Sequence, residues 1–471
     1  MATHVQQNGS SSTSVLEVEL EPVYLSTPLP KRSSAEPQVR GKTSCNDGDA
    51  TSRQDTSSLP PPSTTTDVVQ RWNYPRKNIP RVASCFWSFI VMGANDAAYG
   101  PLIPYIQAYY DLTYLIVSLL FLSPFVGYTA AAFLNNVIHL KAGQRGVAFT
   151  SSACHLVAYV IIAVHPPYPV LVITFVLAGF GNGIADAAWN AWIGNMARAN
   201  EMLGFLHGLY GAGAVLSPLI ATTMITKGNL PWYAFYYLMI GMAAVEVVAS
   251  VSCFWKATGR EYRESLTKHS DSSQGSLKEA LFKQPAARVT WLCSLFLLGY
   301  VGIEVALGGW IVEFMIQVRN GEPFASGMTA TGFWLGLTIG RVVLGFVTPK
   351  LGEKLAIMIY LPLTMGLELL FWLVPQFYVS AVAVGLQGFF MGPLFPAAIV
   401  AVSKLLPRHL HVGAIGFAAA FGGSGAAVLP FAVGAIAQAK GVQVLQPIIL
   451  ALLAVICLLW IGLPKMEKKK E

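Results

Sequence analysis

The chain has 471 residues, of which 54% are hydrophobic and only 12% are charged. Soluble domains carry about 25% charged residues, so a water-soluble protein of this size is excluded and a chain with many membrane-spanning helices is predicted. The net charge is +7, which could suggest a nucleic-acid-binding protein, but the positions of the basic residues explain it better as a membrane-topology signal.

Residues 1–80 are polar, rich in Ser and Thr, and include the run Pro60-Pro61-Pro62. Such a segment cannot bury enough apolar area to offset the entropy of ordering, so we expect a disordered tail. No apolar run follows a basic start near Met1, and a cleavable signal peptide is therefore not expected.

From Val82 onward the sequence contains apolar segments long enough to cross a hydrocarbon core of about 30 Å. We predict twelve of them, at residues 82–108, 113–138, 145–164, 168–195, 202–226, 231–255, 289–316, 324–348, 354–374, 376–403, 411–438 and 443–463. The connections are short except for the charged, serine-rich stretch 256–288. We therefore expect two six-helix bundles, 81–255 and 289–464, a central loop between them and a basic tail at 465–471.

The Lys and Arg residues near the ends of these segments fall mostly on one side of the membrane. The exceptions are Lys227, Arg319 and Lys440. Because cytosolic loops carry the excess of positive charge, both termini and the central loop 256–288 are predicted to be cytosolic. We expect a multi-pass protein of the plasma membrane that has no nucleic-acid partner.

Two short sequence stretches in the first half recur in the second half. Gly100-Pro101-Leu102-Ile103-Pro104 in the first segment resembles Gly392-Pro393-Leu394-Phe395-Pro396 in the tenth, and Gly211 with Pro218 in the fifth has the spacing of Gly423 with Pro430 in the eleventh. Nested repeats of this kind are typical of secondary transporters, which bind substrate near the bilayer midplane. The glycine-proline pairs are expected to bend their helices.

Acidic residues inside these segments are costly, at about 2.5 to 3.5 kcal/mol each on insertion scales. Asp96 lies near the middle of the first segment, and Asn182, Asp186 and Asn190 follow an i, i+4, i+8 spacing on one face of the fourth. Such a polar stripe fits both a substrate path and a packing seam between helices.

In the second half, Glu304 could contact substrate or pair with Arg341. His207 and Tyr210 in the fifth segment and Gln387 in the tenth could form hydrogen bonds with a polar substrate, although packing is the common role of such residues. Structural roles are expected for His155, Glu246 and Glu368. Glu313 lies near the outer end of its segment, where its side chain is expected to reach the membrane interface.

The pattern as a whole resembles the major facilitator superfamily, and within it the proton-coupled fucose permease group and related fungal permeases. The resemblance covers about 82–463 and rests on four stretches, Asn95-Asp96 with Pro104, Asp186 to Asn190, Tyr300 to Trp310, and Gly332 to Arg341. Two features depart from the family patterns. Residues 135–145 keep a glycine and a basic residue but lack the usual aspartate, and His207 stands where the fucose permeases have a sugar-binding glutamine.

The resemblance implies an all-α membrane protein with the major facilitator fold, and alternating access of a monomer that takes up a sugar-like small molecule together with protons. No G-x-S-x-G, H-E-x-x-H or Walker sequence is present, so neither an enzyme nor an ATP-driven pump is expected. We expect no cofactor and no metal.

We assign proton coupling to Asp186 or Asp96, with Asp186 favoured. Substrate binding is assigned to seven residues, Asn95, Asp96, Asn190, His207, Tyr210, Glu304 and Gln387. Three alternatives remain open, namely an exporter, an uncoupled facilitator of another small molecule, and a nutrient receptor that does not transport.

Overall fold

The computed structural model describes residues 70–267, 274–407 and 410–465. Most of the expected tail, and residues 466–471 of the basic C-terminus, lie outside the described residues. The first helix begins at Asn78, inside the range expected for the tail. Residues 70–77 are also ordered against the bundle, because the backbone NH of Ala197 donates to the carbonyl of Gln70 over 2.8 Å.

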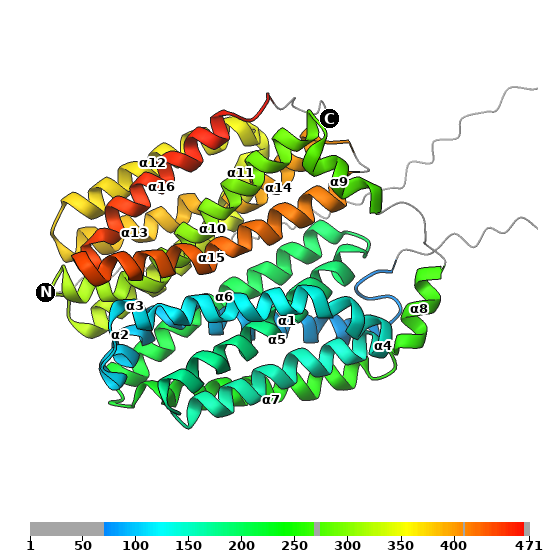
Figure 1. The fold of residues 1–471 in the computed structure, drawn as a ribbon, viewed down its shortest axis with the longest axis horizontal. Coiled ribbons are helices and arrows are strands. Elements are labelled where there is room, and N and C mark those ends of the chain that lie inside the picture. The colour runs from blue at the N-terminus through cyan, green and yellow to red at the C-terminus, as the bar shows by residue number, and fades with distance from the viewer. Residues whose placement is uncertain (1–69, 268–273, 408–409, 466–471) are drawn as a thin grey trace, which may run out of the picture. The chain divides into compact units, whose positions relative to one another are not determined.

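The first half of the chain folds into helices whose limits follow the apolar segments (Figure 1). They are α1 (Asn78–Ala97), α2 (Tyr99–Tyr110), α3 (Tyr114–Val117), α4 (Leu119–Ala163), α5 (Tyr168–Gly194), α6 (Ala199–Thr226), the 3-10 turn η1 (Trp232–Ala234) and α7 (Phe235–Phe254).

The second half is built in the same way. Its helices are α10 (Ala286–Gln317), α11 (Pro323–Leu351), α12 (Glu353–Leu373), α13 (Phe377–Met391), α14 (Leu394–Leu405), α15 (His411–Lys440), the 3-10 turn η3 (Val442–Val444) and α16 (Leu445–Ile461). The stretch expected as a loop between the halves also contains two short helices, α8 (Gly259–Thr267) and α9 (Gln274–Phe282).

Breaks within the helices reconcile this list with the twelve predicted segments. The 45 residues of α4 contain two segments, because Gly143 has φ 69° and ψ −163° and turns the chain between them. The first segment is divided between α1 and α2, just before Gly100-Pro101, and the tenth between α13 and α14 at Gly392-Pro393. Proline lacks the amide donor that a continuous helix needs, which accounts for breaks at these positions.

The outer surface of the helices is suited to lipid. Several large apolar side chains are mostly exposed, among them Phe133 at 79%, Phe346 at 73% and Leu458 at 69%. Exposure of this extent to water would be unfavourable, whereas hydrocarbon tails are as apolar as these side chains. Among the described residues, ten helices are long and apolar enough to cross a membrane, and one of them, Tyr114–Ala163, contains two of the predicted segments. With the segment divided between α1 and α2, they fit an all-α membrane protein of twelve spans in two six-helix bundles.

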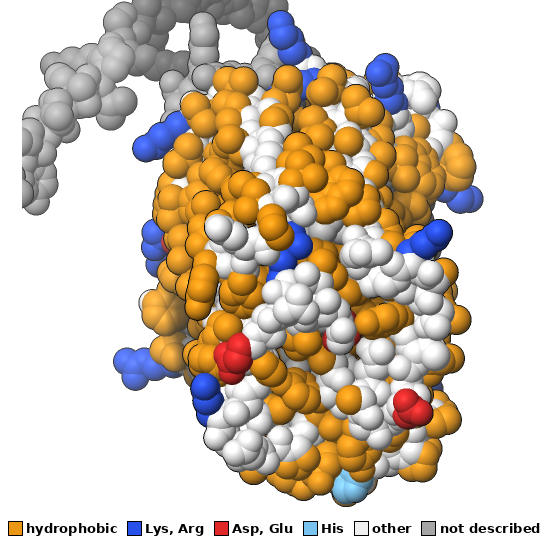
Figure 2. All heavy atoms as spheres, turned by 90° about the vertical axis from the view of Figure 1, so that its left-hand side faces the viewer, with side chains coloured by type: hydrophobic (Ala, Val, Ile, Leu, Met, Phe, Trp, Pro, Cys, Tyr) orange, Lys and Arg blue, Asp and Glu red, His pale blue; other side chains and the backbone are white. Residues whose placement is uncertain are grey.

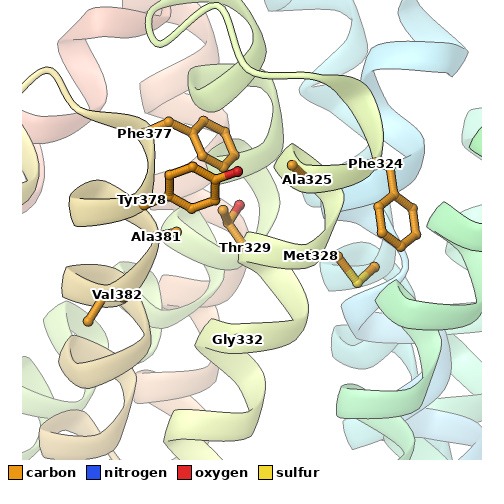
Figure 3. A pocket seen from close by; sticks show the side chains of 9 residues that line it. All are labelled: Phe324, Ala325, Met328, Thr329, Gly332, Phe377, Tyr378, Ala381 and Val382. Carbon is orange, nitrogen blue, oxygen red and sulfur yellow. The ribbon is translucent and has the colours of Figure 1, made fainter.

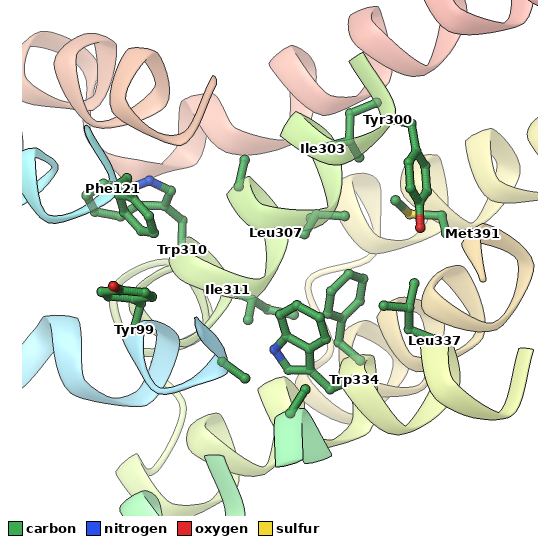
Figure 4. Close-up of a cluster of buried hydrophobic side chains, with 14 of the residues drawn as sticks. Tyr99, Phe121, Tyr300, Ile303, Leu307, Trp310, Ile311, Trp334, Leu337 and Met391 are labelled. Atoms are coloured by element: carbon green, nitrogen blue, oxygen red, sulfur yellow. The ribbon is translucent and has the colours of Figure 1, made fainter. Parts of the chain in front are cut away.

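The two halves meet at the end of the molecule that contains α2 and α3. There Tyr99 packs against Phe121 with ring centroids 5.7 Å apart, and Phe121 packs against Trp310 at 5.8 Å (Figure 4). The hydroxyl of Tyr114 donates to Glu313 Oε1 over 3.0 Å. Figure 2 views this end, whose surface is mainly hydrophobic or uncharged with scattered charged side chains. These contacts join the two halves at this end.

Candidate functional site

Asp96 is the centre of a polar cluster formed by three helices of the first half. Its Oδ1 accepts hydrogen bonds from the side-chain amides of Asn95 and Asn182, each at 3.0 Å, and its Oδ2 accepts one from the Tyr210 hydroxyl at 3.0 Å. Asn95 and Asn182 are buried, whereas Asp96 and Tyr210 remain partly accessible. These three hydrogen bonds replace bonds to water that the carboxylate loses inside the protein.

Close packing of α1 against α6 makes this cluster possible. A Cβ on Gly93 would overlap the carbonyl oxygen of Tyr210, and a Cβ on Gly213 would overlap the carbonyl oxygen of Ile90. Small residues let helix backbones approach in this way in membranes. The glycines therefore bring the phenol of Tyr210 within reach of Asp96 on the neighbouring helix.

Asp186 and Asn190 continue the polar stripe along α5. The amide of Asn190 donates to Asp186 Oδ1 over 2.8 Å and to the Asp186 carbonyl over 2.9 Å. Nε2 of His207, an exposed residue, lies 3.0 Å from Asn190 Oδ1. Because that oxygen can only accept, the His207 Nε2 carries the proton. Asp186 thus has one side-chain donor, against three for Asp96.

The second half presents an ion pair to this cluster. Arg341 of α11 donates to Glu304 of α10 over 2.8 Å, with the two side chains 23% and 9% exposed. Arg341 interacts electrostatically with His207, and Glu304 does so with Tyr210. Both predicted alternatives for Glu304 therefore remain, since it pairs with Arg341 and also faces the polar cluster of the first half.

Gln387 does not join the other predicted residues. Its amide donates to Glu368 Oε2 over 2.8 Å, and both side chains are fully buried between α13 and α12. A substrate contact at Gln387 would require this buried pair to separate. Glu313 also differs from the expected solvent-facing residue, because it is 3% exposed and accepts the bond from Tyr114 between the halves.

Asn182 and Arg341 are the polar residues that the sequence-based selection left out of the site. Asn182 belongs to the polar stripe that the sequence predicts on α5, and its contact with Asp96 lies on the same helical face as Asp186. The sequence indicates Arg341 only as an ion-pair partner of Glu304. A rule that any amide or charge in the same stripe belongs to the site would have included Asn182.

The pocket drawn in Figure 3 is a separate feature. It has a volume of about 410 Å³ and lies between α11 and α13, lined by Phe324, Met328, Tyr378 and other mainly apolar residues (Figure 3). None of the predicted site residues lines it. Its apolar lining offers few hydrogen-bond partners for a polar solute.

Two bundles of membrane-spanning helices that face each other across polar side chains define the class of secondary transporters. A sequence profile of the Major Facilitator Superfamily matches residues 85–322 and 304–471. The chain therefore belongs to this superfamily, and it is a multi-pass integral membrane transporter rather than an enzyme.

Two sequence relatives and one solved structure illustrate the likeness. The chain is 30% identical to Bypass of stop codon protein 6 of Saccharomyces cerevisiae, over 83% of this chain and 84% of that protein. It is 21% identical to the glucose/mannose transporter GlcP of Bacillus subtilis, over 74% and 85%. The structure resembles FucP, a major facilitator transporter crystallised in the outward conformation, with a TM-score of 0.57, 16% identity, and 83% of this chain and 100% of that chain covered.

Proposed function

We propose that this transporter imports a sugar or a similar small polar metabolite together with protons, by alternating access of the two bundles. The observation that carries the proposal is the Asp96 cluster, in which one carboxylate collects donors from three helices and one of these donors, Tyr210, interacts electrostatically with Glu304 and Arg341 of the other half. A substrate rich in hydroxyls needs several donors and acceptors in place of water. The name of the relative GlcP, a glucose/mannose transporter, supports the same class of substrate.

In this proposal Asp96 binds substrate and Asp186 carries the proton. Asp96, with three donors, is suited to stay charged and to accept bonds from substrate hydroxyls, because hydrogen bonds to a carboxylate favour its charged form. Asp186 has one side-chain donor, from Asn190, and therefore loses fewer bonds when it takes up a proton. Asp186 is accordingly the favoured proton carrier.

Reconstitution into proteoliposomes tests the proposal directly. Vesicles preloaded with unlabelled D-glucose, D-mannose or L-fucose are expected to take up the labelled sugar by counterflow, and an inward proton gradient is expected to drive accumulation above equilibrium. Protein-free vesicles and a gradient collapsed by a protonophore are the controls. Counterflow that ignores the gradient would indicate a facilitator, and binding without counterflow would indicate a receptor.

The proposed orientation places both termini and residues 256–288 in the cytosol of a plasma-membrane protein, so that the end with α2 and α3 faces outward. An epitope inserted at residue 270 is then expected to bind antibody only after permeabilisation. An epitope beside Asn229, in the turn between α6 and η1, is expected to bind in intact cells. The reverse pattern would overturn the orientation.

A further inference from the structure

Behind the candidate site, the first half contains a buried charged pair that has no part in the proposed binding or coupling. Nδ1 of His155 on α4 lies 2.9 Å from Oε2 of Glu246 on α7, and the two side chains are 0% and 1% exposed. The Ser88 hydroxyl on α1 donates to the other carboxylate oxygen of Glu246 over 2.5 Å. Both glutamate oxygens therefore have partners, and the ring is fixed at one nitrogen.

The other ring nitrogen lies against Gly181 of α5, the helix that also carries Asn182. Nε2 of His155 and Oδ1 of Asn182 are both buried and have no hydrogen-bond partner among the described residues, and the two side chains interact. Gly181 leaves room for the ring, because a Cβ there would lie 2.7 Å from His155 Cδ2 and 2.8 Å from Nε2. The amide nitrogen of the same Asn182 donates to Asp96.

We infer that His155, held by Glu246, is a positioning residue for Asp96, because its Nε2–H attracts the unpartnered Asn182 Oδ1 and so keeps the Asn182 amide nitrogen turned toward the Asp96 carboxylate. The inference rests on the proposed role of Asp96. The orientation of a buried amide follows from its partners. If Nε2 were unprotonated it could only accept, and the amide would turn its oxygen toward Asp96, where it meets a carboxylate without a proton to share.

This assignment fixes the protons of the buried pair. With a proton on Nε2, the bond between Nδ1 and Glu246 contains one further proton, on either the ring or the carboxyl group. In both forms the pair has no net charge, as burial in low dielectric favours. The chain of contacts then runs from Glu246 on α7 through His155 on α4 and Asn182 on α5 to Asp96 on α1, and Ser88 of α1 donates to its Glu246 end.

Several neighbouring groups act electrostatically on members of this chain. They are Tyr99 of α2, Tyr128 and Tyr159 of α4, Asp186 of α5 and Tyr210 of α6. Phenols are neutral near pH 7. Among these described neighbours, Asp186 is therefore the group whose charge can change during transport.

Two substitutions at one position separate positioning from packing. In His155→Gln the side-chain amide nitrogen can occupy the position of the His155 Nε2, so a donor toward Asn182 is kept. The side chain in His155→Asn is shorter, and its amide nitrogen can replace only Nδ1, which faces Glu246. Infrared titration of the purified protein in liposomes follows the carboxyl band that disappears in Asp96→Asn. We expect its midpoint to move about one pH unit upward in His155→Asn, the effect of losing one bond to a charged group, and to stay at the wild-type value in His155→Gln.

A measurement on the wild-type protein keeps the test independent of how well the variants fold. Nitrogen-15 NMR of histidine-labelled protein, with the His155 signal identified by its absence in His155→Gln, is expected to show a proton on Nε2. An unprotonated Nε2, or the same Asp96 midpoint in both variants and wild type, would overturn the inference. Neither readout needs a transported sugar, so a failed counterflow experiment with these readouts intact would refute the proposed function alone.

Discussion

Asp186→Asn is expected to abolish accumulation against a gradient while leaving substrate exchange in place. An asparagine cannot take up or release a proton, so the step that links proton entry to substrate entry is lost. Its side-chain oxygen still accepts the bond that the Asn190 amide gives to Asp186 Oδ1 at 2.8 Å. The link from Asn190 to His207 and the geometry of the cavity are thereby retained. Counterflow and gradient-driven uptake, measured in the same proteoliposomes, separate the two activities.

Asp111→Asn is the matched control for this change. Asp111 follows the last residue of α2 and has φ 52°, a left-handed conformation that Asn adopts readily. The substitution removes one negative charge, as Asp186→Asn does, but at a position away from the site. Its uphill uptake is expected to equal that of the wild type. If Asp186→Asn also accumulates substrate at the wild-type level, Asp186 has no part in coupling.

The twelve spans could be predicted from the sequence because each one is a long apolar run, and hydropathy reports the transfer of side chains to lipid directly. Helix breaks were predictable only where they have a chemical cause. Gly100-Pro101 and Gly392-Pro393 marked two of them, and the structure divides both segments there. The helices α8 and α9 were missed, since a charged, serine-rich stretch has no hydropathy signal for helix.

The candidate site was predictable in part. The pair Asn95-Asp96 and the distant residue Tyr210 are predicted as polar residues in two different apolar segments, and the structure brings Tyr210 to Asp96. Gln387 was selected by the same reasoning, yet it points to Glu368 on a neighbouring helix. Hydropathy reports the depth of a residue along its helix but not the rotation of that helix about its axis, which depends on packing such as that of Gly93 against Tyr210.

Asp96→Asn is expected to weaken substrate binding about 100-fold. A carboxylate has about four acceptor positions, and Asn95, Asn182 and Tyr210 occupy three, which leaves one for a substrate hydroxyl. A hydrogen bond to a charged group contributes about 1.5 to 3 kcal/mol, and the upper end corresponds to roughly 100-fold in affinity. We expect the upper end of this energy range for a further reason. The side-chain NH2 of the introduced asparagine is itself a donor, so it would face one of the donors that now bind Asp96 and would disturb the binding site.

Tyr210→Phe provides the intermediate member of the series. It removes one donor from Asp96 and leaves the charge. Because water or substrate can fill the vacated carboxylate position, we expect affinity to fall by about 10-fold or less. Tyr237→Phe is the matched control, because Tyr237 is 59% exposed on the outer surface of α7; its affinity is expected to match wild type. Isothermal titration of detergent-purified protein with the sugar that shows counterflow measures all three dissociation constants. Wild-type affinity in Asp96→Asn would remove the carboxylate from the binding site, since no remaining group in the cluster could replace its charge.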